Sequence, residues 1–453
     1  MSFSRRDFFK KSLATGAGVA AASVLAPIPT EAQSKTAKKP IPVSVSEDVV
    51  PSTGDKVLLN KIRQARYVAS KPKVSSLGIL HYTDIHGDSI AANKILSIMD
   101  DYAPYIDAVL NTGDAVQYFV EPTKEYPFGA QWWRDSGLAE KSLFVLGNHD
   151  GAKGSNSKGH KEGSADWDFY GKEKSYDIFF KDYVEGLGCV MPEGNDDPKS
   201  KFYKSCFWHK DFPEAKIRLI GADCMHFYDT FRHKTSEQEE WLTARLEDTL
   251  DPSNPAYGYS VIVASHYPLD DFEGEDGIWD EASHKFKYNS SPEGGIVIDF
   301  KSSAPTPFHT ISMKSFNAEK RFAIRQKIAN SEAKYGYDKS EVNPLGDAIR
   351  AWKDKGGKFI AWICGHCHFD MLYYPAKYPD MLCVALDQAG NLRGNAFTDR
   401  GADLESRVCA NYYGIDTQNG LFKIVRIGLS MDKFMVQKNT LCYDYINNVV
   451  ISG

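Results

Sequence analysis

The chain has 453 residues, of which 42% are hydrophobic and 25% are charged. This composition is typical of a soluble globular protein, and the length is sufficient to bury a large core. The formal net charge of −6 argues against a protein that coats a nucleic-acid polymer, because such proteins usually carry a basic excess.

The N-terminal residues predict export from a bacterial cytoplasm. Arg5 and Arg6 belong to a Ser-Arg-Arg-Asp-Phe-Phe-Lys stretch that matches the twin-arginine pattern. Residues 13–26 are weakly apolar, and small residues that resemble a cleavage site follow them. We therefore expect residues 1–32 to be a signal peptide that the twin-arginine export machinery recognises, and the mature chain to be periplasmic or secreted. Because the apolar stretch is short and rich in Ala and Gly, it does not predict a permanent membrane span.

Residues 33–70 read as a linker and an N-terminal extension. The first part, 33–54, is rich in Pro, Ser, Thr and Lys, which is typical of a linker. Residues 56–70 predict a helix packed on the outside of the main domain, which we place at 71–453. Within that domain, residues 91–99 have apolar side chains at helical spacing and predict a crossover helix after the first strand.

Five short polar blocks each follow an apolar run that is typical of a buried strand. Open α/β sheets present ligand-binding groups where strands end, so these side chains can gather at one rim. Oxygen and imidazole donors in this number suit divalent Zn, Mn or Fe, and they suffice for two metals that share a bridging carboxylate. The blocks are Asp84-Ile85-His86, Gly113-Asp114, Gly147-Asn148-His149-Asp150, His266 and Gly365-His366-Cys367-His368.

These blocks, in this order, resemble the calcineurin-like metallophosphoesterase superfamily over residues 75–430. The resemblance implies an α/β fold, a four-layer α/β/β/α sandwich of two mixed sheets with helices outside. We expect residues 75–150 to build one sheet and the later strands to build most of the other. The resemblance also implies hydrolysis of a small-molecule phosphate mono- or diester by a hydroxide bound to two metals.

The resemblance divides the polar residues between two metal sites that share one ligand. The first metal would be held by Asp84, His86 and His368, and the second by Asn148, His266 and His366. Asp114 would bridge the two metals. His149 would not bind metal; it would act as the general acid for the leaving group, with Asp150 orienting its ring.

One departure narrows the resemblance. Purple acid phosphatases have glycine in place of His86 and a tyrosine three residues after the bridging aspartate, where this chain has Gln117. A tyrosinate–iron centre is therefore not predicted, and the pattern is closer to the phosphodiesterase and phosphatase branches. A second function class is a catalytically inactive metal-binding or interaction protein on the same fold. Such a protein should lack a ligand or the acid, whereas every position here holds a competent residue type.

Two long segments between the blocks, near 151–215 and 270–344, are expected to be insertions in the domain. The first begins with a Gly-, Ser- and Lys-rich stretch that predicts a loop at the site entrance. His81, in the first strand, is expected to be a core residue with satisfied hydrogen bonds. The strands expected to complete the second sheet are 381–386, 412–416, 421–427 and 434–437. The motifs indicate phosphorus chemistry but do not set the substrate.

Overall fold

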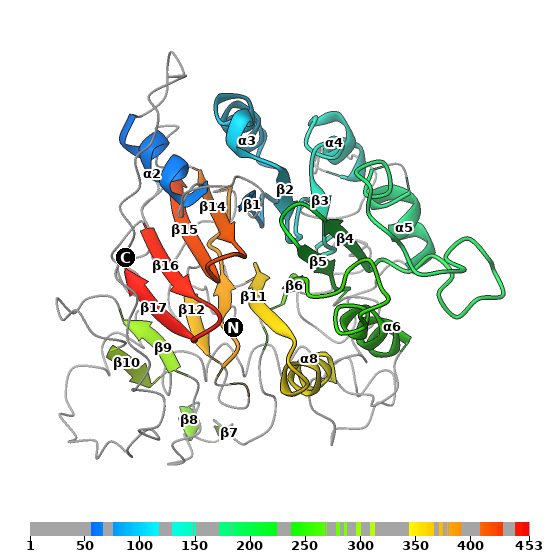
Figure 1. The fold of residues 1–453 in the computed structure, drawn as a ribbon. Helices are drawn as coiled ribbons and strands as arrows, with labels where there is room; N and C mark the ends of the chain where they lie inside the picture. The colour runs from blue at the N-terminus through cyan, green and yellow to red at the C-terminus, as the bar shows by residue number, and fades with distance from the viewer. Residues whose placement is uncertain are drawn as a thin grey trace.

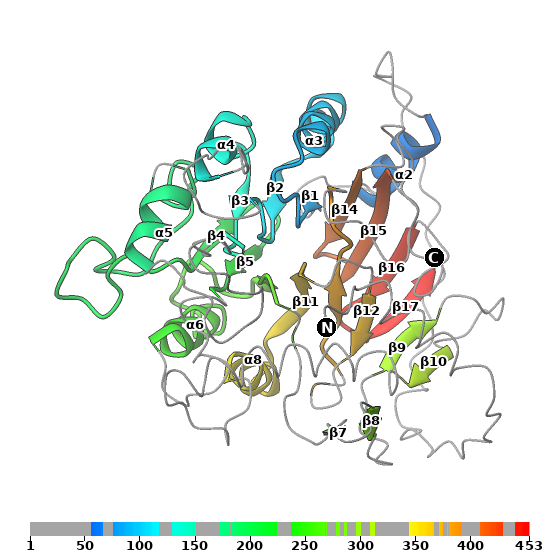
Figure 2. The same cartoon turned by 180° about the vertical axis from the view of Figure 1, so that it is seen from behind.

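A computed structural model describes the part of the chain that carries the sheets and most of the polar blocks. The described residues are 56–66, 76–116, 129–147, 149–150, 172–181, 183–223, 237–267, 269, 278–280, 285–287, 296–299, 309–312, 344–366, 371–374, 378, 380–390, 408–428 and 440–452. Within these ranges two mixed sheets face each other, and helices lie on their outer sides (Figures 1 and 2). This arrangement confirms the expected α/β fold class.

The first sheet has, among the described residues, seven strands in the order β17-β16-β15-β14-β1-β2-β3. Its parallel part is formed by β1 (Ser76–Tyr82), β2 (Ala108–Asn111) and β3 (Leu143–Phe144). Its antiparallel part is formed by β14 (Cys409–Asp416), β15 (Leu421–Gly428), β16 (Thr440–Asp444) and β17 (Val449–Ser452). The polar blocks at 84–86 and 113–114 directly follow β1 and β2, so parallel pairing brings them to one edge of the sheet.

The second sheet, over the ranges that the structure covers, has the strand order β10-β9-β12-β13-β11-β6-β5-β4. Its parallel centre contains β5 (Ile217–Gly221), β6 (Ser260–Ala264), β11 (Lys358–Cys364) and β13 (Cys383–Ala385). Antiparallel strands flank it: β4 (Trp208–Phe212), β12 (Met371–Tyr374), β9 (Ile296–Asp299) and β10 (His309–Ser312). Two further strands, β7 (Ile278–Asp280) and β8 (Lys285–Lys287), pair with each other.

The C-terminal strands correct one expectation. We expected the strands after residue 380 to complete the second sheet, but only β13 does so, while β14 and β15 belong to the first. β1 is paired by β2 on one edge, and β14 satisfies the backbone groups of its other edge in an antiparallel register from Ser76↔Asp416 to His81↔Asn411. The expected strand 434–437 lies outside the described residues.

The helices form the outer layers. In Figures 1 and 2, α2 (Lys56–Arg66) and α3 (Ser89–Asp101) lie outside the first sheet, and α6 (Glu237–Glu247) and α8 (Pro344–Asp354) lie outside the second. The remaining described helices are α4 (Ala130–Asp135), α5 (Lys172–Phe179) and a short 3₁₀ turn, Ala103–Tyr105. The predicted outer helix and crossover helix are thereby confirmed as α2 and α3. No helix within the described ranges is long and apolar enough to cross a membrane.

The crossover helix α3 begins with an N-terminal cap. The side chain of Asp88 accepts hydrogen bonds from the backbone N–H groups of Ile90 and Ala91, which caps the first turn. Its buried stripe then follows the expected helical spacing, through Ala91, Ala92, Ile95, Ile98 and Met99. The cap matters for the site because it ends the loop that carries Asp84 and His86.

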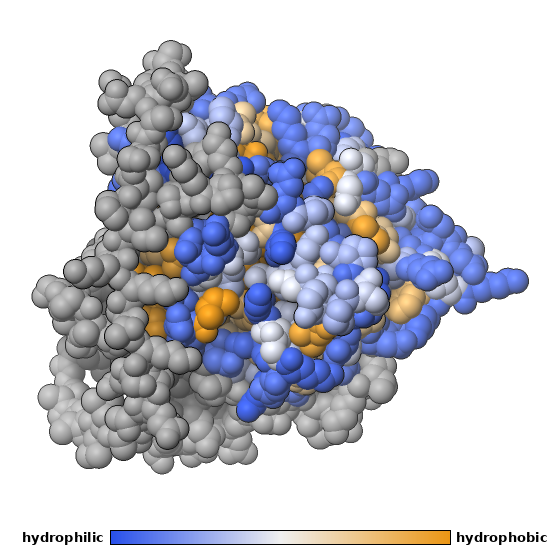
Figure 3. Space-filling model, in the orientation of Figure 1, coloured by the Kyte–Doolittle hydropathy of each residue, from blue (hydrophilic) through white to orange (hydrophobic). Residues whose placement is uncertain are grey.

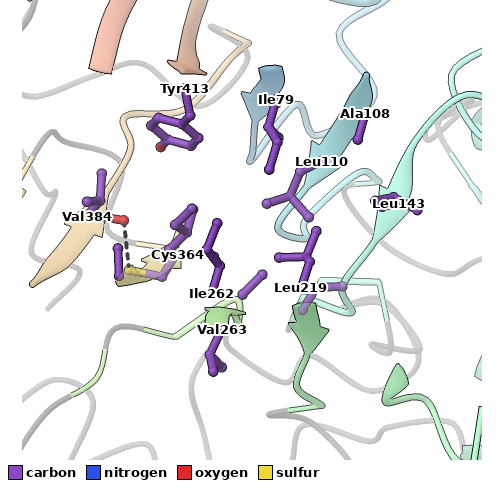
Figure 4. Packing of buried hydrophobic residues seen from close by; sticks show 14 of the residues in the cluster. Ile79, Ala108, Leu110, Leu143, Leu219, Ile262, Val263, Cys364, Val384 and Tyr413 are labelled. Carbon is purple, nitrogen blue, oxygen red and sulfur yellow. Dashed lines mark hydrogen bonds between the residues drawn. The ribbon is translucent and has the colours of Figure 1, made fainter. Parts of the chain in front are cut away.

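The main hydrophobic core fills the space between the sheets. Ile79 and Leu110 from the first sheet meet Leu219 and Ile262 from the second, and all are fully buried (Figure 4). The face seen in Figure 3 is largely hydrophilic over the helices, and its apolar residues form small separate groups. The polar residues buried at one rim of this core are therefore the feature that needs a functional explanation.

Candidate metal centre

The loops after β1 and β2 run side by side beyond the ends of their strands. The backbone N–H of Asp84 donates to the carbonyl oxygen of Gly113 at 2.9 Å, and that of His86 donates to the carbonyl oxygen of Asp114 at 2.9 Å. These bonds continue the parallel ladder into the loops. These backbone contacts bring the side chains of Asp84, His86 and Asp114 close together.

Backbone strain is concentrated at the same place. Among the described residues, seven non-glycine residues have a positive φ, and they include Asp84 (52°), His86 (49°), Asp114 (52°) and His366 (65°). A left-handed conformation at a non-glycine residue is unfavourable by roughly 1–2 kcal/mol. Strained conformations of this kind cluster at functional sites because the surrounding structure imposes them. Four such residues at one rim mark it as a site and not as a simple turn.

Asp114 lies at the centre of the cluster. Its Oδ2 atom faces the Nε2 atoms of His266, His86 and His149 at 3.4, 3.8 and 3.9 Å. Its Oδ1 atom accepts a hydrogen bond from the backbone N–H of His149 at 2.7 Å. Burial by itself would raise the pKa of Asp114, but the charges of His266, His149 and His86 outweigh burial and hold that pKa well below its usual range.

His266 brings the second sheet into the site. It follows β6, and its Nδ1–H donates to the carbonyl oxygen of Thr112 in the first sheet at 2.7 Å. In the neutral ring this bond leaves the Nε2 lone pair directed at Asp114, as a metal ligand requires. Burial lowers the pKa of His266, but the Asp114 carboxylate raises it to about 9, so the site favours positive charge at this position.

His366 and Asp84 connect the last block to the first. The backbone N–H of His366 donates to Oδ2 of Asp84 at 2.9 Å, and the Thr83 hydroxyl donates to the same oxygen at 2.7 Å. The ring of His366 packs edge to face against the rings of His266 and Tyr267, with centroids 5.0 and 4.4 Å apart. The block after β11 therefore closes the cluster from the second sheet.

Asp150 holds the loops and not the ring of His149. Its Oδ2 atom accepts from the backbone N–H groups of Asp114 and Gly147 at 2.8 Å each, and its Oδ1 atom accepts from that of Val116 at 3.1 Å. Every hydrogen bond that the described part of the chain gives Asp150 thus goes to backbone, in place of the expected bond to the His149 imidazole. Burial, followed by the charge of Asp114, raises the pKa of Asp150 to about 8.

Glycine is required where two of the loops meet the acidic residues. A Cβ atom on Gly147 would lie 2.2 Å from the backbone nitrogen of Asp114, and one on Gly365 would lie 2.0 Å from the hydroxyl oxygen of Thr83. Real Cβ atoms do not approach other atoms under about 3.0 Å. The glycines in these blocks therefore permit the close approach that brings the ligand residues together.

The structure brings together six of the nine sequence-predicted residues as side-chain neighbours: Asp84, His86, Asp114, His149, His266 and His366. The donor atoms of five of them, all except Asp84, form two groups that share Asp114, one with His86 and His149 and the other with His266 and His366, and within each group the atoms lie within 4.8 Å of one another. A carboxylate and imidazoles are the donors that Zn, Mn and Fe prefer, so this set fits divalent metal. Asn148 and His368 lie outside the described residues, and their roles as ligands stay predictions.

One supporting loop was missed by the sequence reasoning. Residues 386–390, which follow β13, lie against the loop of Asp84: the backbone N–H of Ala389 donates to the carbonyl oxygen of Thr83 at 2.7 Å. Asp387 and Gln388 in this loop are buried, and a Cβ atom on Gly390 would lie 2.6 Å from the carbonyl oxygen of Ile85. The signal was the same as for the other blocks, since polar residues and a glycine follow an apolar strand.

Comparison with known proteins agrees with the geometry. Residues 77–293 match the family model described as calcineurin-like phosphoesterase. The similarity to calcineurin-like phosphoesterases covers just under half of the chain. This phosphoesterase match spans the blocks from Asp84 to His266, while His366 lies beyond it. No curated protein matches the chain at a significant level.

Several solved structures are similar to this chain at low sequence identity. A dimetal phosphatase from Danio rerio is 9% identical over 82% of this chain and 99% of its own, with a TM-score of 0.40. A conserved phosphoesterase-like protein from Streptococcus pneumoniae is 12% identical over 81% and 97%, with a TM-score of 0.27. GAP50, the anchor in the inner membrane complex of Plasmodium, is 11% identical over 81% and 88%, with a TM-score of 0.37.

Proposed function

We propose that the phosphoesterase domain hydrolyses phosphate mono- or diesters with the help of two divalent metal ions. The observation that carries this proposal is the pair of donor groups that share the Asp114 carboxylate. A shared carboxylate between two sets of imidazoles is what a two-metal centre needs, because the two ions must lie about 3.5–4 Å apart. The family match over residues 77–293 supports the same chemistry.

The proposed ligands come from both sheets. One ion would be held by Asp84, His86 and His368, the other by Asn148, His266 and His366, and Asp114 would contact both. Divalent Mn, Zn or Fe in these positions would supply positive charge for the phosphate oxygens and acidify the water that attacks phosphorus. The chain's own contribution is to fix the donors: the loop bonds of Asp84 and His86 and the Thr112 bond of His266 set their directions before substrate arrives.

His149 is proposed as the general acid. Its backbone N–H is bound to Asp114 Oδ1, its ring packs edge to face on His86 with centroids 4.8 Å apart, and its Nε2 lies 3.9 Å from Asp114 Oδ2. This position places the ring beside the donors, where a phosphate ester bound to the metals would be within its reach. An imidazole in this place can donate a proton to the leaving alkoxide. The same distances would also let His149 act as a ligand, so the two roles need an experiment.

Replacing His149 with alanine separates these roles. As the acid, His149→Ala should keep both metals and slow the hydrolysis of alkyl esters by about 10²–10⁴-fold. The loss should be smaller for p-nitrophenyl phosphate and its bis-ester, because nitrophenolate leaves without a proton. His209→Ala is the matched control, since it removes a buried imidazole that packs on Trp241 outside the centre.

Two results would contradict the proposal in different ways. A His149→Ala protein with half of the wild-type metal content would make His149 a ligand and not the acid. Full hydrolytic activity of the wild-type protein after dialysis against a chelator would end the two-metal proposal itself. The measurements are metal content by mass spectrometry and initial rates on the two substrate classes.

We also propose that the mature enzyme works outside the cytoplasmic membrane. The support is the Arg5-Arg6 pattern and the apolar stretch that follows it, which lie outside the described residues. In that location the domain would act on phosphate esters from the envelope or the surroundings and not on cytosolic metabolites. The twin-arginine route carries folded proteins, as a metalloenzyme loaded before export would require.

A further inference from the structure

Hydrogen bonds to the hydroxyl and to the carbonyl of Thr112 connect the core between the sheets with His266. The hydroxyl group of Tyr413 and Nδ1 of His81 are 2.8 Å apart, and Nε2 of His81 and the hydroxyl oxygen of Thr112 are 2.8 Å apart. The carbonyl oxygen of Thr112 then accepts from Nδ1–H of His266 at 2.7 Å. Tyr413 points into the space between the sheets in Figure 4. The series therefore starts among apolar side chains and ends at a proposed metal ligand.

His81 is a polar residue at a fully buried position. His81, Thr112 and Tyr413 are all fully buried, and a buried imidazole is unfavourable unless its nitrogens are bonded. Burial lowers the pKa of His81 to about 3, with the charge of Asp84 opposing it, so the ring is neutral. A neutral imidazole has one donor and one acceptor nitrogen, and Tyr413 and Thr112 use one each. The expectation of a satisfied core histidine is confirmed, but packing alone does not explain why the residue is polar.

The polar side chain of His81 is explained by its contact with Thr112, whose backbone is only weakly bound to the sheet. It follows the last residue of β2 and precedes Gly113, whose φ of 100° starts the turn to Asp114. Its N–H reaches the carbonyl oxygen of Tyr82 at 3.3 Å, which is long beside the usual 2.9–3.0 Å. The bond from His81 to the Thr112 hydroxyl is a second attachment at the point where the ladder ends. It limits the rotation of the residue whose carbonyl must face the second sheet.

We propose that His81 is a positioning residue for the metal centre and that it acts through Thr112 on His266. By fixing the Thr112 carbonyl, His81 fixes the ring plane of His266 and the nitrogen that it turns toward Asp114. This inference rests on the proposed function, because it assigns His266 to a metal. It adds to that function a support that extends from the C-terminal end of β1 to the ligand on the opposite sheet, and that begins at the buried Tyr413.

The test is a set of metal titrations on purified, metal-free protein whose folded state is checked by circular dichroism. Thr112→Val keeps the shape of the residue and removes the hydroxyl, and it should weaken the binding of one of the two Mn²⁺ ions by up to about 10-fold, less than the 10–100-fold effect of losing a ligand's outer partner, because the Thr112 carbonyl remains. His81→Phe should weaken the same ion. The double variant should bind no more weakly than the weaker single variant, because both changes break one series of bonds.

Two further variants separate positioning from a general loss of stability. Tyr82→Phe removes a buried hydroxyl from the same strand, one that is bonded to Ser142 at 2.8 Å, and it should leave both Mn²⁺ affinities unchanged. His81→Gln keeps a donor and an acceptor and should recover part of the affinity that His81→Phe loses. Wild-type affinities in Thr112→Val would overturn the positioning role while the metal centre stands. A wild-type protein that takes up no Mn²⁺, Zn²⁺ or Fe²⁺ would instead overturn the proposed function and this inference with it.

Discussion

A single methyl group at Gly147 should disrupt the metal centre. In Gly147→Ala the new Cβ would lie 2.2 Å from the backbone nitrogen of Asp114 and 2.4 Å from its Oδ1 atom. Asp114 cannot move away freely, because its N–H is bound to Asp150 and its Oδ1 is bound to the N–H of His149. Relief of the contact must therefore break at least one of these bonds and shift the carboxylate that the two donor groups share.

The expected loss of stability follows from the same contacts. Overpacking of a closely packed site costs roughly 1–3 kcal/mol. Loss of a hydrogen bond to a buried carboxylate adds about 1.5–3 kcal/mol. The free energy of unfolding should therefore fall by roughly 2.5–6 kcal/mol if both effects occur. The metal content should fall with it, because a displaced Asp114 no longer reaches both ions.

Urea unfolding and metal analysis by mass spectrometry measure these two effects separately. Gly258→Ala is a suitable control, because a Cβ atom there would meet no atom within 4 Å and the only penalty is the positive φ of 77°. The free energy of unfolding of that variant should fall by only roughly 1–2 kcal/mol, because a non-glycine residue at a positive φ is strained. The variant should keep its metal. A Gly147→Ala protein with two bound metals and an unchanged free energy of unfolding would contradict this prediction.

Three other predictions test separate parts of the molecule. Asp114→Ala should lose both metals and the hydrolytic activity together, and a metal content near the wild-type value would contradict the shared ligand. Arg218, which is buried and binds two partly exposed carboxylates, stabilises the β5–α6 contact. Arg218→Leu should lower the free energy of unfolding by about 3 kcal/mol, the low end for a broken buried pair, with no change in metal content. Replacing Arg5 and Arg6 with lysine should leave unprocessed precursor in the cytoplasm, and immunoblots of cell fractions that show normal export would remove the localisation proposal.

The sequence was sufficient to predict most of the cluster, because the signal for each member is local. An apolar run and a polar block are neighbours in the chain, so the ends of β1, β2, β6 and β11 could be recognised without knowledge of the pairing. The parallel centre of each sheet then brings those ends to one rim. For this reason Asp84, His86, Asp114, His266 and His366 converge as expected.

The remaining features depend on pairing between distant segments. Nothing near residues 409–416 indicates that β14 pairs with β1 and not with the second sheet, since the apolar pattern suits either position. The role of Asp150 was misjudged for a related reason: a carboxylate beside a histidine suggests a bond to the ring, whereas the available backbone N–H groups become visible only once the loops are in place. The partner of His81 was likewise hidden, because Thr112 contacts it from the loop that follows the neighbouring strand β2.

The place of β14 beside β1 has a consequence for the order of events during synthesis. His81 and Tyr413 are bonded although they are 332 positions apart in the sequence. Until the ribosome has made residues 409–416, the edge of β1 that β14 will cover stays open. An open strand edge can form hydrogen bonds with the wrong strand or with another chain. Contacts between such distant segments also form slowly. A chain that has emerged from the ribosome as far as His368 would contain every proposed ligand. It would still lack β14, the strand that pairs with β1. If export requires a folded chain, it can begin only after the C-terminal strands have been made, although none of them contributes a ligand.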